Sequence, residues 1–145
     1  LVHHLEELLT FADVPPALDQ VEHHVRLQQP ELRDWCAANG VTLQAWAPIM
    51  RGKVARIPEV VSIGARHGKT AAQVAIRWIL QHGVTTIPKS VHRERVAENA
   101  DVFDFALTPE EMTVLDGLDR GDRVGSSPDQ FAAFGGLTRL IHPPK

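Results

Sequence analysis

The sequence has little cysteine and no long apolar run, and both shortages narrow the classes of protein it can belong to. A single cysteine, Cys36, excludes an internal disulfide and a cysteine-rich metal cluster. No stretch approaches the roughly 20 apolar residues that a membrane-spanning helix needs. The net charge of −3 and the isoelectric point near 6.2 give no electrostatic basis for binding nucleic acid or an anionic membrane. We therefore expect a cytoplasmic protein with neither kind of partner.

Tyrosine is absent altogether, so no tyrosine of this chain can act as a proton donor. The 145 residues, 43% apolar and 23% charged, have the length and composition of one globular domain. The chain starts at Leu1 in an amphipathic helical pattern with no signal-peptide pattern, and we expect further sequence upstream. Cys36 lies in a helix-like run, which favours a buried core thiol over a catalytic one.

Apolar periodicity and turn residues predict alternating helices and strands. Thr70, with Gln73 three residues later, has the pattern of a capping box, and Thr108–Pro109 is a second helix start. The predicted helices cover 5–9, 30–39, 58–67, 70–82, 93–99 and 108–118, and the predicted strands cover 17–22, 41–46 and 84–87. Residues 50–53 are predicted to be a loop, and residues from 121 onward an extended tail.

This alternation of strands and helices is typical of parallel βα units. Three strands are too few to close a barrel, since a complete (β/α)8 barrel takes roughly 250 residues. On the pattern alone, the chain is part of a barrel or a small doubly wound sheet. A dinucleotide-binding doubly wound sheet would need a glycine-rich first turn, and none is present.

The most informative segment is 87–99, which follows the third predicted strand. It places two cations, Lys89 and Arg95, at a strand end and at the start of a short helix. Strand ends of this kind face the ligand in parallel α/β folds, and the helix dipole adds positive potential. A phosphate dianion suits this arrangement because Arg grips it bidentately. Glu98 and Asn99, one turn further on, are placed to bind a polar heterocycle such as an amino-purine.

The same segment resembles the aldo-keto reductase signature I-P-K-S-x-x-x-x-R-x-x-E-N at every fixed position. The resemblance covers essentially the whole chain and is strongest to bacterial diketo-gluconate-type reductases. It implies an α/β chain in which residues 1–119 form the C-terminal portion of a (β/α)8 TIM barrel, about three βα units, and residues 120–145 form a tail. It also implies an NADPH-dependent enzyme that reduces aldehydes or ketones to alcohols.

The cofactor-binding residues implied by the resemblance fall in three segments. The matching positions are Gln20, Trp46, Ala47, Ile49, Lys89, Ser90, Val91, Arg95, Glu98 and Asn99. Gln20 would bind the nicotinamide carboxamide and Trp46 would stack on the nicotinamide ring. The two cations would bind the 2′-phosphate, with Ser90 and Val91 lining the same site, and the last two residues would hydrogen-bond the adenine.

Several positions depart from the family pattern and bear on cofactor affinity. Asp19 stands where the family has Asn, and Ala47 where it has Ser. Ile49 and Met50 replace the common Leu-Gly pair, so we expect a less mobile loop over the pyrophosphate. His92 also departs, replacing the common Thr.

No catalytic residue is predicted in this chain. In the family, a Tyr protonates the forming alkoxide, assisted by Lys, Asp and His, and all four come from earlier barrel segments. We therefore expect the 145 residues alone to be inactive, and to need the missing N-terminal half of the barrel, or self-association, to cover the exposed sheet edges. The alternative is a catalytically inactive nucleotide-binding module, a pseudoenzyme or regulatory subunit of the same fold.

Eight histidines raise the question of a metal site, and none is predicted. His23 and His24 are neighbours on a strand and would point to opposite faces. The acidic residues of the tail fit no calcium-loop spacing, and solvation is the favoured interpretation. In the tail, Phe131 and Phe134 are candidates for an apolar lid over a carbonyl substrate.

Overall fold

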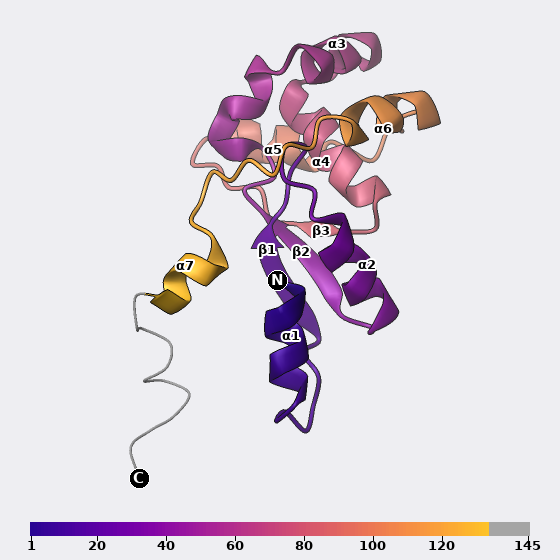
Figure 1. Cartoon of the computed structure of the whole chain (residues 1–145). Coiled ribbons are helices and arrows are strands. Elements are labelled where there is room, and N and C mark those ends of the chain that lie inside the picture. The colour runs from indigo at the N-terminus through magenta and orange to yellow at the C-terminus, as the bar shows by residue number, and fades with distance from the viewer. Residues whose placement is uncertain (134–145) are drawn as a thin grey trace.

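The computed structural model describes residues 1–133, and its elements follow in an alternating order (Figure 1). The elements are α1 (Val2–Leu9), β1 (Leu18–Glu22), α2 (Pro30–Ala38), β2 (Thr42–Trp46), the 3-10 helix η1 (Met50–Arg56), α3 (Pro58–His67), α4 (Ala71–Gln81), β3 (Thr85–Thr86), α5 (Arg93–Ala100), α6 (Pro109–Asp116) and α7 (Pro128–Ala133). Every helix and strand predicted from the sequence is present, with shorter strands. None of the helices within residues 1–133 combines the length and the apolarity that crossing a membrane requires.

The three strands form one parallel sheet in the order β1-β2-β3. Five residue pairs join β1 to β2, from Leu18 beside Thr42 to Glu22 beside Trp46, whereas β2 and β3 share two. Parallel neighbours require crossover connections, which α2 and the α3–α4 pair supply. All three strands therefore end at the same edge of the sheet, where the loops after them meet.

Two helices begin as their sequences predict. The Thr70 hydroxyl accepts from the Gln73 backbone N–H while the Gln73 side chain accepts from the Thr70 N–H, so the capping box of α4 is complete. Thr108 and Glu111 form the same reciprocal pair at α6. Such caps satisfy backbone donors that would otherwise have no partner in the first turn.

The core lies between the sheet and the helices that cover it. Trp78 of α4 is fully buried, and its indole N–H donates to Asp116 at 2.7 Å, which fastens α6 to α4. Cys36 is also buried, as predicted, and burial raises the pKa of its thiol. A buried thiol with a raised pKa is a packing residue and a poor nucleophile.

Two sequence predictions are wrong in detail. Residues 50–53 belong to η1, which is interrupted by a kink at Arg51 and Gly52, so the expected open loop is a tight turn. The predicted structureless tail contains α7, and the chain between α6 and α7 runs back across the molecule (Figure 1). Its backbone is held there by hydrogen bonds from Arg120 and Asp122 to the carbonyl of Arg26, which sequence periodicity cannot reveal.

Candidate functional site

The turn that follows β2 has an unusual backbone. Ala47, Met50 and Arg51 all have left-handed φ angles, of 54°, 53° and 55°. Left-handed conformations are disfavoured for residues with a Cβ and cluster at functional sites. The turn closes with hydrogen bonds from Met50 N–H to the Ala47 carbonyl at 2.8 Å and from Gly52 N–H to the Ile49 carbonyl at 2.8 Å. A glycine at the Met50 position would adopt this φ angle without strain.

A cavity of about 680 Å³ opens between this turn and the segment after β3. Its walls come from the β2–η1 turn, the start of α4 and the β3–α5 segment. The lining includes Ala47, Ile49, Arg51, Thr70, Lys89, Ser90, Val91, Arg95, Glu98 and Asn99. Cavities of this volume commonly hold small ligands and cofactors. Eight of the ten residues predicted to bind the cofactor therefore lie around one cavity.

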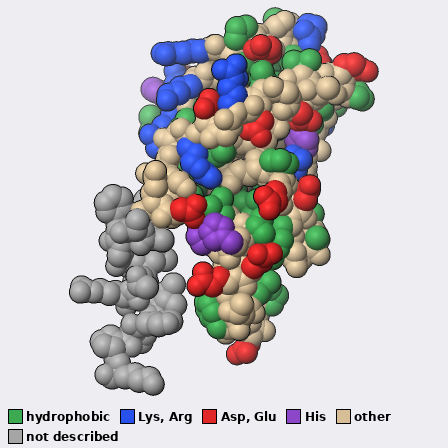
Figure 2. Space-filling model, viewed as in Figure 1, with side chains coloured by type: hydrophobic (Ala, Val, Ile, Leu, Met, Phe, Trp, Pro, Cys, Tyr) green, Lys and Arg blue, Asp and Glu red, His purple; other side chains and the backbone are tan. Residues whose placement is uncertain are grey.

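Cationic side chains line the cavity. Lys89 and Arg95 both line it, and their part in phosphate binding stays a prediction. Arg51 adds a third cation, which the sequence analysis did not single out. Figure 2 shows Lys and Arg side chains gathered over the end of the molecule that carries η1 and α5. Beside them, the Ser90 hydroxyl accepts from the His92 backbone N–H at 3.1 Å and shapes the entry into α5.

Polar side chains at the start of α4 and on α5 also line the cavity. Asn99 is buried on α5, and Glu98 accepts a hydrogen bond from the Thr70 hydroxyl at 2.6 Å. This bond links α5 to the cap of α4 and fixes the carboxylate at the cavity wall. Thr70 was predicted only as a helix cap, so its second role depends on a contact between helices that lie 28 positions apart in sequence.

Gln20 and Trp46 do not line this cavity. The Gln20 amide donates to the Gln44 side chain at 2.7 Å, across the β1–β2 pair. Asp19, beside it, is half-buried, and burial raises the pKa of its carboxyl. Gln20 lies in the middle of β1 and Trp46 is the last residue of β2, so the predicted nicotinamide-binding residues lie on the sheet and outside the lining of this cavity.

Glu22 forms a buried clamp that the sequence analysis missed. Its carboxylate accepts from His24 at 2.9 Å and from the backbone N–H groups of Val124 and Gly125 at 2.5 and 3.1 Å. Burial alone would raise the pKa of Glu22, but these hydrogen bonds outweigh it and leave the pKa below its ordinary value. The clamp holds the tail against Trp46, since a Cβ at Gly125 would collide with the Trp46 ring.

Comparison with known proteins finds a family and relatives that match most of the chain. The profile of the Aldo/keto reductase family matches residues 2–120. The glyoxal reductase of Bacillus subtilis (strain 168) is 50% identical over 130 residues, covering 90% of this chain and 47% of that protein. Methylglyoxal reductase DkgA of Escherichia coli (strain K12) is 39% identical over 132 residues, covering 90% of this chain and 48% of that protein.

Solved protein structures also match most of this chain. A Gox0644 mutant in complex with NADPH matches with a TM-score of 0.84 and 38% identity, over 89% of this chain and 48% of that one. MGS-M4, an aldo-keto reductase from a Medee basin deep-sea metagenome library, matches with a TM-score of 0.84 and 38% identity, over 88% and 48% of the two chains. The chain thus spans about half the length of the relatives it matches.

Proposed function

Because this chain belongs to the aldo/keto reductase family, we propose that it supplies the NADPH-binding part of a reductase that converts small aldehydes or ketones to alcohols. Its three-stranded parallel sheet corresponds to a portion of the family's (β/α)8 barrel. The single observation that carries the proposal is the shared cavity of Lys89 and Arg95, with Glu98 and Asn99 in its wall.

The cationic side chains of the cavity fit the 2′-phosphate of NADPH. Lys89 supplies a point charge and Arg95 a planar pair of donors, and together they match a phosphate dianion. Ser90 and Val91 line the same cavity. Arg95 lies in the first turn of α5, where the helix dipole also favours an anion. NADH lacks this phosphate, so the same residues would select NADPH over NADH.

Glu98 and Asn99 in the cavity wall fit the adenine. Asn99 offers both an amide donor and an acceptor, and Glu98 offers a carboxylate already held by Thr70. An amino-purine presents the complementary donors and acceptors. The β2–η1 turn, through Ala47 and Ile49, would then cover the pyrophosphate.

We assign the nicotinamide end to Gln20 and Trp46. Gln20 would hydrogen-bond the carboxamide, and Trp46, which the tail clamp holds in place, would stack on the ring. When bound, the nicotinamide supplies the hydride for carbonyl reduction. The residues of this chain bind and orient the cofactor.

Proton transfer to the product oxygen would have to come from outside these 145 residues, because the family's Tyr has no counterpart in a chain without tyrosine. We expect no carbonyl reductase activity from this chain alone.

The alternative function is that of a nucleotide-binding module without catalysis. Upstream coding sequence with the Asp, Tyr, Lys and His motifs would favour the enzyme. The names of the two bacterial relatives indicate a small 2-oxoaldehyde as the first substrate to test.

The test is NADPH binding by calorimetry on the native protein. Removing a charge-assisted contact costs about 1.5–3 kcal/mol, so Arg95→Ala should weaken NADPH binding by roughly 10- to 100-fold and leave NADH binding nearly unchanged. Arg93→Ala is the matched control, because Arg93 is an exposed cation of the same helix that does not line the cavity. Equal losses in the two variants would show only a general charge effect and would contradict the proposal.

A further inference from the structure

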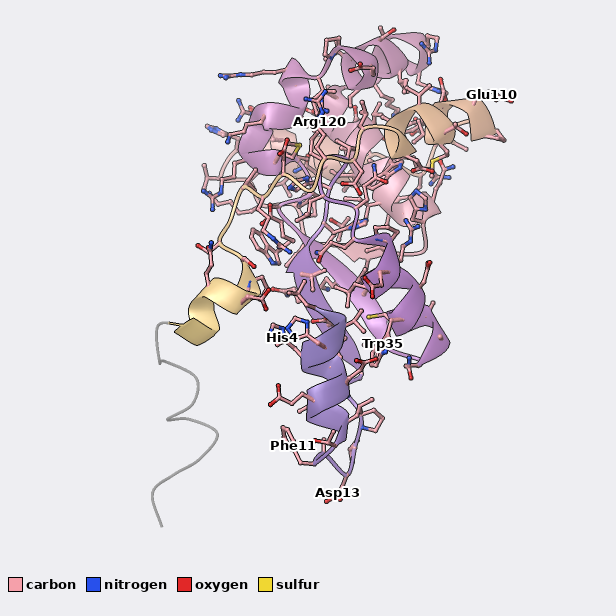
Figure 3. The ribbon with its side chains drawn as sticks, in the orientation of Figure 1. His4, Phe11, Asp13, Trp35, Glu110 and Arg120 are labelled. Atoms are coloured by element: carbon pink, nitrogen blue, oxygen red, sulfur yellow. The ribbon has the colours of Figure 1, made fainter. Side chains whose placement is uncertain are left out.

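Two histidines near the start of the chain meet an aspartate near its end. His3 and His4 lie on α1, and Asp129 lies on α7. The Nε2 atoms of the two histidines are 3.2 and 3.3 Å from the same Asp129 oxygen, and the ring centroids are 4.1 Å apart. Figure 3 shows His4 on the side of α1 that faces α7. Three potential ligand atoms thus lie within 4.8 Å of one another.

The spacing of these atoms differs from that of the other histidine–carboxylate pairs among residues 1–133. His24, His67 and His82 lie 2.8–2.9 Å from their carboxylates, the length of a strong hydrogen bond. The His3 and His4 contacts are longer. Ligands at about 2.0–2.1 Å around a tetrahedral zinc ion lie about 3.3 Å apart, so these contacts match the edge of a coordination tetrahedron better than a strong ion pair.

The donor set has the chemistry of a transition-metal site. Two imidazoles and one carboxylate suit Zn²⁺ better than Ca²⁺ or Mg²⁺, which prefer oxygen ligands. All three side chains are partly exposed, at 61%, 37% and 56%, so an ion has an open path and a fourth position remains for water.

We propose that His3, His4 and Asp129 form a Zn²⁺ site that fastens α7 to α1. The site is separate from the cavity around Lys89 and Arg95 and does not depend on the proposed cofactor. The ion would be the second anchor of the tail, after the hydrogen bonds that Glu22 accepts from the segment just before α7. Its role is to hold α7 in place beside α1.

Titration of the metal-free native protein with ZnCl₂ tests the site. Calorimetry should show one Zn²⁺ per chain, and His3→Ala, His4→Ala and Asp129→Asn should each lower the affinity at least tenfold. His92→Gln and Asp13→Asn are the controls, because both remove an exposed side chain of the same type outside the cluster. Circular dichroism should show that all five variants keep the fold. No Zn²⁺ binding by the native protein, or equal losses in the controls, would overturn the proposal.

Limited proteolysis gives a second readout of the same site. Trypsin can cut after Arg120 and Arg123 in the segment between α6 and α7. If Zn²⁺ ties α7 to α1, its addition should slow these cuts severalfold in the native protein and leave them unchanged in Asp129→Asn. Equal protection by Zn²⁺ in both proteins would place the bound ion elsewhere.

Discussion

His23 is a buried histidine with an identifiable energetic cost. Its ring is fully buried and stacks on Trp78, with centroids 5.3 Å apart. Within residues 1–133, neither ring nitrogen has a hydrogen-bond partner. Burial, followed by the nearby cations Arg33 and His82, lowers the pKa of His23 to about 4. The backbone of Gln28 opposes this shift without reaching hydrogen-bonding geometry.

The replacement of His23 by phenylalanine should therefore remove a pH-dependent penalty. The folded chain takes up this proton near pH 4, whereas an unfolded histidine takes it up near pH 6.5. The unfolded state thus binds more protons in this window, and stability is full above pH 6.5 and falls as the pH drops towards 4. A shift of this size is worth about 3 kcal/mol in total, of which about 2 kcal/mol is lost between pH 7 and pH 5.

The assay is denaturant unfolding of the native protein and of His23→Phe at pH 7 and at pH 5. At pH 7 the variant should be about 1–2 kcal/mol more stable, because two unpaired buried nitrogens are removed and the ring stacking on Trp78 is kept. At pH 5 the difference should grow by about 2 kcal/mol. Exposed His92→Gln is the control and should leave the pH dependence unchanged. A difference between His23→Phe and the native protein that stays constant from pH 7 to 5 would refute the reasoning.

Two further predictions concern the tail and a helix cap. Gly125→Ala should lower the free energy of unfolding by about 1–3 kcal/mol, because the new methyl group collides with Trp46. Gly117→Ala is the control and should change the free energy of unfolding little, since its methyl group would make only ordinary contacts. Equal effects of the two substitutions would contradict the collision. Thr70→Ala should lower the free energy of unfolding by about 1–2 kcal/mol, because it removes the cap of α4 and the hydrogen bond to Glu98. Thr70→Ser keeps the hydroxyl and should restore most of the lost stability. If the serine variant is as unstable as the alanine variant in the same unfolding assay, the hydroxyl is not the cause of the loss.

The features predicted correctly are those set by residues close together in sequence. The capping boxes at Thr70 and Thr108 depend on groups three positions apart, and both formed as predicted. Lys89 and Arg95 also lie close together in sequence and line one cavity, while their role in cofactor binding stays a prediction. Local hydrogen bonding and helix dipoles act within a few residues, which is why a sequence can reveal them.

The features that were missed depend on contacts between distant segments. The clamp on Glu22 needs backbone donors that lie more than 100 positions further along the chain, and α7 rests beside α1. Phe134 of the suggested lid lies outside the described residues, and the side chain of Phe131 is not described. The division into residues 1–119 and 120–145 stays a prediction, although the clamp joins the two parts.

The β2–η1 turn shows how tertiary packing can fix a conformation that its own residues disfavour. Left-handed backbone at Met50 costs roughly 1–2 kcal/mol relative to right-handed backbone, and the family's usual Gly would avoid this cost. Here the Met50 side chain is buried, as is that of Val54 in the same 3-10 helix. Burying two apolar side chains is worth about 1.5–3 kcal/mol each, which is comparable to the total strain of the three left-handed residues in this turn. The turn therefore keeps the shape of the cavity wall without the glycine, and Ala47 and Arg51 are held at the cavity by the same packing.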